Sequence, residues 1–208
     1  MSVAAPAPKA TGSGMPGVPG KAPRTGIAGR WRILCWWLFR RIGGWRFEGD
    51  FPDVSRLVII VAPHSSAWDG IWGLTAKVGL DLDIVFMGKK ELFKGPLGWL
   101  LRRLGGLPVD RASPRGVAAQ VAQQMNASTK MWFVLAPEGT RSRVDQWKAG
   151  FWKIARATDA PVLCVAFDYP RKTIVIGPLL RTTDSYDADL ALIREWYRPF
   201  VGRHRGTG

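Results

Sequence analysis

The sequence predicts an α/β fold: a single layered domain with a largely parallel central sheet flanked by helices, preceded by an amphipathic helix. Two observations indicate this class. From residue 46 onward, short apolar runs rich in β-branched residues alternate with longer segments of helical character. The chain has 208 residues, enough for one domain with one hydrophobic core. We therefore divide it into residues 1–27, residues 28–45 and a domain over residues 46–208.

Residues 1–27 are rich in Pro, Gly and Ala, contain no acidic residue and have few large apolar side chains. Such a segment cannot bury enough apolar surface to offset the entropy that ordering would cost. We expect it to be a disordered basic tail.

Residues 28–45 combine tryptophans with arginines and are expected to form a helix. The segment is too short to span a bilayer, which takes about 20 apolar residues. Arginines that bracket tryptophans and leucines are typical of a helix lying in the interface of an anionic membrane. The alternative is a first helix that packs on the core and leaves its arginines in solvent.

The first elements of the domain follow from apolar runs and helical spacing. Residues 56–62, RLVIIVA, form a continuous β-branched apolar run, which is typical of a buried strand. Residues 69–80 are expected to form a helix, and residues 83–88 a second strand. Residues 89–106 have helical character, but Gly95–Pro96 interrupts them.

The alternation of strands and helices continues along the rest of the chain, which favours a parallel sheet with helical crossovers. The expected strands are 107–109, 131–137, 161–169 and 172–177, and the expected helices are 114–127, 148–159 and 187–201. We find no internal repeat in the sequence.

The chain is strongly basic, with a formal net charge of +14 and a pI near 10.6. Such a charge implies an anionic partner: nucleic acid, a membrane surface, or an acidic or phosphorylated substrate. The eleven tryptophans favour a membrane surface, because the indole ring is amphipathic. A nucleic-acid partner is not expected, since no known nucleic-acid-binding module is present.

Cysteine and histidine are too scarce for a metal site. Cys35 and Cys164 lie far apart without metal-like spacing, and the chain has two histidines. We therefore expect reduced cysteines in a cytosolic setting and no metal. No apolar run is long enough to span a bilayer, and the N-terminus lacks the apolar core of a signal peptide.

Polar residues follow three of the expected strands. His64 follows residues 56–62, the stretch APEGTR at 136–141 comes at the end of the strand that begins at residue 131, and Arg111 follows 107–109. In open parallel sheets, ligands bind at the carboxyl ends of the strands. We expect the three clusters to converge on one cleft.

His64 and Asp69 are candidates for an acid–base pair. On a continuous helix, residues five apart are about 140° apart and do not meet. They can meet if His64 lies in the turn before a helix and Asp69 in its first turn, with Ser65 and Ser66 at the cap. The aspartate would then hold one ring nitrogen and leave the other as a proton acceptor. The alternatives are simple capping roles, or a serine hydrolase, which the absence of a G-x-S-x-G motif disfavours.

The EGTR stretch predicts an anion-binding loop. Gly139 allows close backbone approach, Thr140 offers a hydroxyl, and Arg141 offers a planar fork suited to phosphate. Arg111 could add a second charge. The alternative is a solvated loop in which Glu138 and Arg141 pair with each other.

PHSSAWD at 63–69 and APEGTR at 136–141, in this order, resemble the glycerolipid acyltransferase family, which includes bacterial 1-acylglycerol-3-phosphate acyltransferases. GGLPVDR at 105–111 matches the arginine-containing block that the family has between these motifs. APVLCV at 160–165 matches the family's fourth block in part, without its second proline. The resemblance covers residues 45–180 and identifies 46–208 as an acyltransferase domain.

The resemblance implies direct transfer of a fatty acyl group from an acyl-carrier protein or acyl-CoA thioester to a lysophospholipid, 1-acylglycerol 3-phosphate above all, at the cytoplasmic face of an anionic membrane. It implies no metal, no cofactor and no covalent enzyme intermediate. By the same resemblance, His64 is the general base and Asp69 orients it. The acceptor-headgroup site comprises Arg111, Glu138, Gly139, Thr140 and Arg141. Two alternatives are transfer to another lysolipid, such as lyso-ornithine lipid, and a non-catalytic lipid-binding protein on the same fold.

Overall fold

The computed structural model describes residues 15–109 and 114–206. Seven strands form one sheet in the order β1-β7-β6-β2-β5-β3-β4. Neighbouring strands are parallel except β6 and β7, which pair antiparallel. The predicted α/β class with a largely parallel sheet is confirmed.

The elements agree closely with the expected ranges. The strands are β1 (Arg46–Glu48), β2 (Arg56–Ala62), β3 (Ile84–Lys89), β4 (Gly106–Val109), β5 (Met131–Leu135), β6 (Val162–Asp168) and β7 (Thr173–Leu180). The α-helices are α1 (Gly29–Trp37), α2 (Ala67–Gly79), α3 (Gly95–Arg103), α4 (Pro114–Ala127), α5 (Gly150–Thr158) and α6 (Tyr186–Tyr197). Two short segments, a π-helical Leu38–Ile42 and a 3-10 helix Lys90–Phe93, complete the set.

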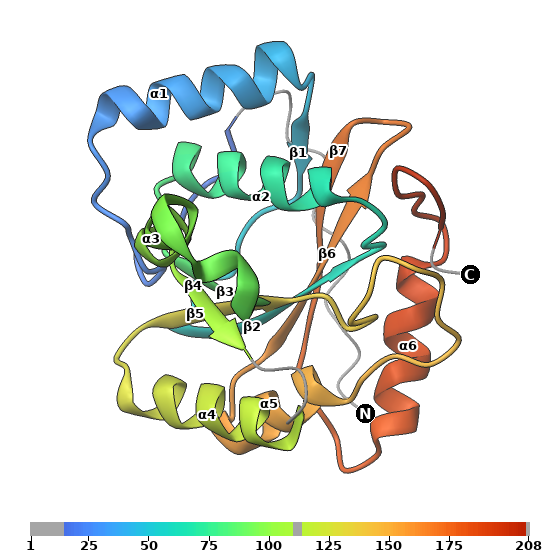
Figure 1. Ribbon diagram of the computed structural model, residues 1–208. Coiled ribbons are helices and arrows are strands. Elements are labelled where there is room, and N and C mark those ends of the chain that lie inside the picture. Colours follow the sequence, from blue (N-terminus) through green and yellow to red (C-terminus); the bar gives the residue numbers. More distant parts are fainter. Residues whose placement is uncertain (1–14, 110–113, 207–208) are drawn as a thin grey trace.

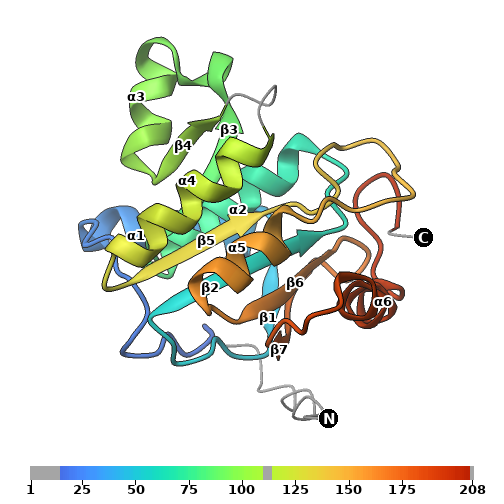
Figure 2. The ribbon, with the colours of Figure 1, turned by 90° about the horizontal axis from the view of Figure 1, so that it is seen from below.

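Helices cover both faces of the sheet. Figure 1 shows α1 and α2 stacked above the sheet, with α4 and α5 below it and α6 at one side. Seen from below in Figure 2, α4 and α5 cross the strands, while α3 and β4 lie beyond β3 at one end of the sheet. The layered order expected from the alternating sequence is therefore present.

The core lies in two layers, one on each face of the sheet. Successive residues of β2 alternate between them, because side chains of a strand point to opposite faces. Leu57 and Ile59 pack with Phe39 and Leu80 of the α1–α2 layer. Val58 and Ile60 pack in the opposite layer, whose helical side chains come from α4, α5 and α6. A strand buried on both faces explains why its sequence is a continuous apolar run.

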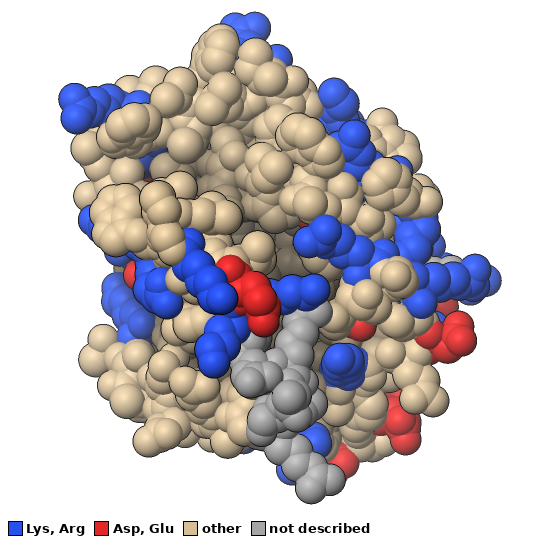
Figure 3. Space-filling model, viewed as in Figure 1, with Lys and Arg blue, Asp and Glu red and all other residues tan. Residues whose placement is uncertain are grey.

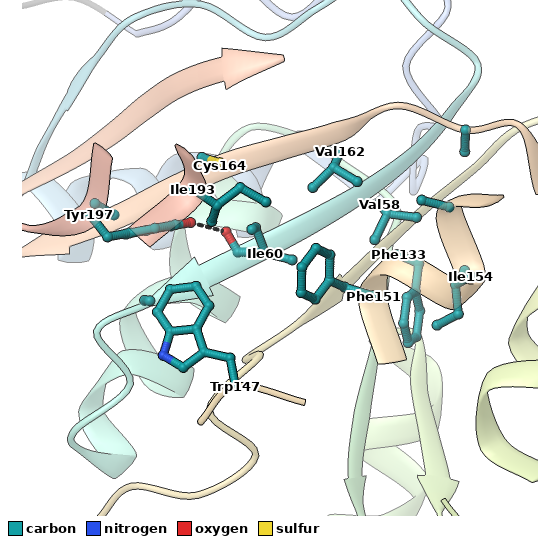
Figure 4. Packing of buried hydrophobic residues seen from close by; sticks show 14 of the residues in the cluster. Val58, Ile60, Phe133, Trp147, Phe151, Ile154, Val162, Cys164, Ile193 and Tyr197 are labelled. Atoms are coloured by element: carbon teal, nitrogen blue, oxygen red, sulfur yellow. Dashed lines mark hydrogen bonds between the residues drawn. The ribbon is translucent and has the colours of Figure 1, made fainter. Parts of the chain in front are cut away.

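Tyr197 at the end of α6 fastens this helix to the sheet. Its side chain is fully buried, and its hydroxyl donates to the carbonyl of Ile60 at 2.6 Å, the bond drawn in Figure 4. The same hydroxyl accepts from the amide of Val165 at 2.9 Å. A buried phenol needs such partners, since an unpaired buried hydroxyl costs free energy. The C-terminal segment therefore leaves the core from a fixed point.

The segment expected as an interfacial helix has two different faces. Phe39 is fully buried beneath it, and the backbone of Trp36 comes so close to α2 that a Cβ on Gly79 would lie 3.2 Å from the Trp36 nitrogen. Trp31 and Trp37 point outward and are about half exposed, at 54% and 49%. The helix thus packs on the core, as the alternative interpretation held, and still presents an aromatic outer face. Within the described residues, no helix has both the length and the apolar character needed to cross a bilayer.

The expectation of a disordered tail over 1–27 is wrong for residues 15–27. Ala22 is buried in the α1–α2 layer, and the Thr25 hydroxyl donates to the carboxylate of Asp81 at 2.6 Å. The Lys21 amide donates to Asp53 at 2.9 Å. These hydrogen bonds and the burial of Ala22 hold in place a segment that is poor in large apolar groups. Residues 1–14 lie outside the described residues.

Two further ranges differ from expectation. Strand β1 was not predicted, because three residues are too few to show an alternating pattern. Helix α6 ends at Tyr197 rather than at residue 201, and the chain turns where the amide of Phe200 donates to the Tyr197 carbonyl at 3.0 Å. This turn directs residues 201–206 toward the carboxyl ends of β2 and β5, where His64 and the EGTR loop lie.

Candidate active site

His64 lies in the turn between β2 and α2, and local hydrogen bonds fix that turn. Ser66 is the N-cap of α2, and its hydroxyl accepts from the amide of Trp68 at 3.3 Å. Asp69, at the third helical position, accepts from the amides of Ser65 and Ser66, both at 3.0 Å. This is a capping box, which stabilises the first turn of a helix. The sequence SSAWD thus sets the position of the residue before it.

The capped turn brings His64 and Asp69 together. Nδ1 of His64 lies 3.1 Å from Oδ2 of Asp69, and the side chains are 27% and 2% exposed. A neutral imidazole held this way donates from Nδ1 and keeps Nε2 as an acceptor. His64 also lines a cavity of about 890 Å³. The arrangement can therefore accept a proton from a ligand in that cavity.

Tyr169, which the sequence reasoning missed, completes the surroundings of Asp69. Its hydroxyl donates to Oδ1 of Asp69 at 2.5 Å, and its ring meets Trp45 edge-on at 4.9 Å. Burial alone would raise the pKa of Asp69, but hydrogen bonds from His64, Tyr169 and the Ser66 backbone hold that pKa below its usual range. Asp69 is therefore ionised and directed at the imidazole. The signal available in the sequence was a tyrosine directly after strand β6.

Burial and the neighbouring Asp69 carboxylate raise the pKa of the Tyr169 phenol well above its usual range. The phenol is thus a permanent donor at physiological pH. It fixes Asp69 without competing for the proton that His64 would take.

Glu138 has a different place from the headgroup contact that was expected. It is 1% exposed. Its Oε2 accepts from the backbone amide of His64 at 2.8 Å, and both carboxylate oxygens accept from Arg205, at 3.0 and 3.1 Å. The pairing of Glu138 with Arg141 considered as an alternative is not what the structure has. The carboxylate links two loops of the protein instead of facing the cavity.

Gly139, Thr140 and Arg141 line the cavity beside His64. Gly139 has φ of 67°, which favours glycine, and a Cβ there would lie 2.8 Å from the side chain of Lys148. Arg141 is exposed, and Thr140 is partly exposed. The loop therefore presents a hydroxyl and a guanidinium at the cavity, and their role in ligand binding stays a prediction. Arg111 lies outside the described residues.

Besides the buried Lys77, three lysines that were not expected from the sequence line the cavity: Lys89, Lys148 and Lys153. They come from the end of β3, the loop before α5, and α5 itself. Lysine next to a glycine-containing loop is a common arrangement for binding phosphate. Figure 3 shows a hollow on this face with basic side chains along its lower edge and an acidic side chain among them. The site thus favours an anionic group near His64.

The cavity itself is large and mostly apolar inside, with a volume of about 890 Å³. Its apolar lining comes mainly from α2 and the strands it covers, including Leu74, Leu80, Ile84, Phe86, Val165 and Phe167. Lys77 is the exception in this wall: burial lowers its pKa, and Asp83 at 3.5 Å partly offsets that effect. A space of this kind accommodates a long apolar group that has a polar end at His64.

No group of three or more His, Cys, Asp or Glu side chains that could hold a metal ion occurs within residues 15–109 and 114–206. The described site brings together an imidazole–carboxylate pair, a loop with an exposed arginine and an apolar cavity.

These features are those of an acyl-transfer enzyme, and comparison with known proteins agrees. The model of the Acyltransferase family matches residues 46–168, more than half of the chain. The chain therefore belongs to the acyltransferase family, and the resemblance drawn from the two motifs is confirmed.

A more particular likeness is to 1-acyl-sn-glycerol-3-phosphate acyltransferases. The enzyme of this name from Streptococcus pneumoniae is 27% identical over 139 residues, which are 66% of this chain and 52% of that protein. The chain thus spans about half the length of that relative. The crystal structure of the 1-acyl-sn-glycerophosphate (LPA) acyltransferase PlsC from Thermotoga maritima matches with a TM-score of 0.53 at 18% identity, over 83% of this chain and 81% of that one. The second likeness supports the fold.

Proposed function

We propose that the protein transfers a fatty acyl group from a thioester to the hydroxyl of a lysophospholipid-type acceptor, with 1-acylglycerol 3-phosphate as the preferred acceptor. The observation that carries the proposal is the His64–Asp69 pair, 3.1 Å apart, at an apolar cavity that basic side chains also line. The cavity suits an acyl chain, and the basic side chains suit a phosphate group.

In the proposed reaction, Nε2 of His64 takes the proton of the acceptor hydroxyl as its oxygen attacks the thioester carbonyl carbon. The tetrahedral intermediate then collapses: the carbon–sulfur bond breaks, and the thiolate leaves with the proton from the imidazolium. Asp69 stabilises the imidazolium while it exists. The products are the acylated lipid and a free thiol, and the acyl group never bonds to the enzyme.

Recognition of the acceptor is assigned to the EGTR loop and its neighbours. The exposed Arg141 and the lysines Lys148 and Lys153 line the cavity and can neutralise a phosphate dianion. Thr140 can donate a hydrogen bond to the same group. The family resemblance adds Arg111. Glu138 supports this loop rather than binding the headgroup.

The donor is proposed to be a thioester of acyl-carrier protein or coenzyme A. Both carry phosphate, and acyl-carrier protein is acidic, so the net charge of +14 attracts either. The enzyme would work as a peripheral protein at the cytoplasmic face of an anionic membrane. Large apolar side chains exposed on α1 and α3 support this placement: Trp31, Ile33, Trp37, Leu97, Trp99 and Leu100.

An assay with purified protein tests the proposal directly. Acyl-carrier-protein and acyl-CoA thioesters are each offered with 1-acylglycerol 3-phosphate, lyso-ornithine lipid or a neutral lysolipid, and free thiol and acylated lipid are measured. We expect turnover with the phosphate acceptor to exceed that with the others. Turnover on lyso-ornithine lipid alone would replace the acceptor assignment. Lipid binding without thiol release from any donor would show a binding protein on this fold and refute the proposal.

A further inference from the structure

The C-terminal segment, residues 201–206, packs against the turn of His64 and the loop of the EGTR stretch. The Gly202 amide donates to the Arg205 carbonyl at 2.8 Å, and the Val201 carbonyl accepts from the Tyr169 amide at 2.9 Å. Figures 1 and 2 both show this segment beside the loop that follows β5. It starts just after Tyr197, whose hydroxyl is fixed in the core. The segment lies outside residues 46–168, the part that matches the family model.

The segment contacts the turn that carries His64. The His204 amide donates to the Ser65 hydroxyl at 3.2 Å. Gly202 leaves no room for a side chain, because a Cβ there would lie 2.7 Å from the same Ser65 oxygen. The Arg203 guanidinium lies over the ring of Trp68, 5.2 Å from its centre. These contacts form a close fit between two segments far apart in the sequence.

Arg205 joins both motifs with one guanidinium group. Nη1 and Nη2 pair with the two oxygens of Glu138 at 3.0 and 3.1 Å. Nη2 also lies 3.3 Å from the carbonyl of His64 and 3.0 Å from that of Ser142. Nε donates to the carbonyl of Arg141 at 3.3 Å. Only a planar, permanently charged fork with five N–H donors can make such a set of bonds.

A substrate-binding role for Arg205 does not fit these contacts. Each of its three nitrogens is already directed at oxygens of the protein, and Nη1 also donates to the carbonyl of Gly206 at 3.0 Å. The side chain is 18% exposed, and its partner Glu138 is 1% exposed. An arginine that binds a substrate phosphate keeps donors free for it. Arg205 instead satisfies a carboxylate that would otherwise be buried without a counter-charge.

We propose that Arg205 is a positioning residue for acyl transfer. Through Glu138 and three backbone carbonyls, it holds the turn of His64 and the loop of Arg141 in one geometry. The proposal rests on the proposed function, because it assumes that His64 and Arg141 act on the same acceptor. Arg205 would act by keeping His64 and Arg141 aligned, because both must contact the same acceptor molecule at the same time.

The test compares Arg205→Ala and Arg205→Lys with Arg198→Ala, whose arginine side chain is 76% exposed and pairs only at the surface with Glu195. We expect Arg205→Ala to lower kcat by roughly 100-fold, the usual cost of a misplacement of about 1 Å. Arg205→Lys should recover little, because an ammonium cannot form the fork. Added guanidinium ion should restore part of kcat in Arg205→Ala only. Arg198→Ala should match the wild type.

A double substitution separates positioning from substrate binding. Because Glu138 and Arg205 act as one unit, Arg205→Ala combined with Glu138→Gln should lose about as much kcat as the more damaging single change. Losses that multiply would overturn the proposal, as would a folded Arg205→Ala protein with unchanged kcat. An increase in acceptor KM alone, with kcat intact, would assign Arg205 to the headgroup and also overturn it.

A readout independent of activity keeps this test apart from the proposed function. Amide hydrogen exchange of residues 138–142 should be faster in Arg205→Ala than in Arg198→Ala, both measured on the full chain. Should the wild type itself lack acyl transfer, the proposed function fails, and exchange then decides whether Arg205 holds the loop. Equal exchange in the two variants would overturn the positioning role.

Discussion

Tyr169 donates its hydroxyl to one carboxylate oxygen of Asp69 at 2.5 Å, while the other oxygen lies 3.1 Å from Nδ1 of His64. One oxygen of the Asp69 carboxylate therefore contacts a phenol, and the other contacts an imidazole. The phenol neutralises no charge, but it fixes the plane of the carboxylate and hence the direction of the imidazole. Tyr169 does not line the cavity, so we expect any effect that it has on acyl transfer to pass through Asp69.

Tyr169→Phe should lower kcat about tenfold, near the low end of what a hydrogen bond to a charged group contributes, ~1.5 kcal/mol. The acceptor and donor KM values should stay as in the wild type, since the phenol touches neither substrate. Steady-state kinetics with each substrate varied in turn measures this. A larger change in KM than in kcat would contradict the assignment of Tyr169 to Asp69.

The same pair predicts a pH-dependent stability. Because the native pKa of Asp69 is depressed, its charged form stabilises the fold above the unfolded pKa of about 3.9 and loses that effect as pH falls through the native pKa. The difference in unfolding free energy between the wild type and Tyr169→Phe should therefore be present near neutral pH and shrink below about pH 4.

Urea unfolding over this pH range measures the difference. Tyr186→Phe is the matched control, because the Tyr186 hydroxyl donates to the backbone carbonyl of Trp147 at 2.8 Å and faces no carboxylate through that bond. Its destabilisation should not vary with acid pH. Parallel behaviour of the two variants would mean that the bond to Asp69 has no part in the effect.

His64→Ala should lower turnover by roughly 10²–10⁴, the usual contribution of a general base, with the fold intact. Asp69→Asn acts on the same step, so the double variant should lose less than the product of the two single losses. Circular dichroism confirms folding, and single-turnover acyl transfer gives the rates. A folded His64→Ala enzyme that keeps wild-type turnover would remove His64 from the mechanism.

Arg141→Ala should raise the KM for a phosphorylated acceptor or lower kcat/KM for it by about tenfold to a hundredfold, as expected for losing about 1.5–3 kcal/mol of charge-assisted hydrogen bonding. Use of an uncharged lysolipid should change little. The ratio of kcat/KM between the two acceptors is the measurement. An equal loss on both would point to disturbance of the loop that Arg205 and Glu138 support.

Membrane binding should depend on the outer face of α1. Trp31→Ser combined with Trp37→Ser should weaken binding to anionic vesicles at least tenfold, since burying one large apolar side chain contributes about 1.5–3 kcal/mol. Both rings are about half exposed, so the fold should persist. Leu192→Ser on α6, which is 68% exposed, is the matched control.

Co-sedimentation with anionic and neutral vesicles at two salt concentrations measures this binding. Added salt should weaken the wild type without abolishing binding, because only the electrostatic part is screened. If the double tryptophan variant pellets like the wild type, contact with the membrane lies elsewhere, with Trp99 and Leu100 of α3 as the next residues to change.

The strands of this fold were predictable where burial on both faces leaves a continuous apolar run. Residues 56–62 are an example, since the predicted and observed ranges coincide. Strand β1 was not predictable, because its three residues pair with Thr173, Ile174 and Val175, far along the chain. The local sequence pattern of a strand does not indicate which distant strand it pairs with.

In the candidate site, too, contacts between residues near in the sequence were predictable, and contacts between distant residues were not. His64 and Asp69 meet because the turn between them is capped by Ser66. The sequence predicted this geometry, since the two residues are five apart and serines stand at the cap position. Tyr169 reaches Asp69 across 100 residues, and Arg205 reaches Glu138 across 67. Such contacts depend on the sheet order, in which β6 lies beside β2 and the C-terminal segment follows from α6. The sequence motifs therefore contain the residues that we propose to react, but they do not include Tyr169 or Arg205, which contact those motifs.

The position of Arg205 has a consequence for engineering by segment exchange. A chimera that transplants residues 46–168 into a related scaffold would carry His64, Asp69 and the EGTR loop but leave behind both Tyr169 and the guanidinium that holds Glu138. In such a chimera, the buried carboxylate of Glu138 would lie next to the backbone of His64 without the positive charge of Arg205. Crossover points placed before residue 46 and after residue 206 would keep these residues together. The segment that has to be exchanged as a whole is therefore longer than the part that contains the sequence motifs.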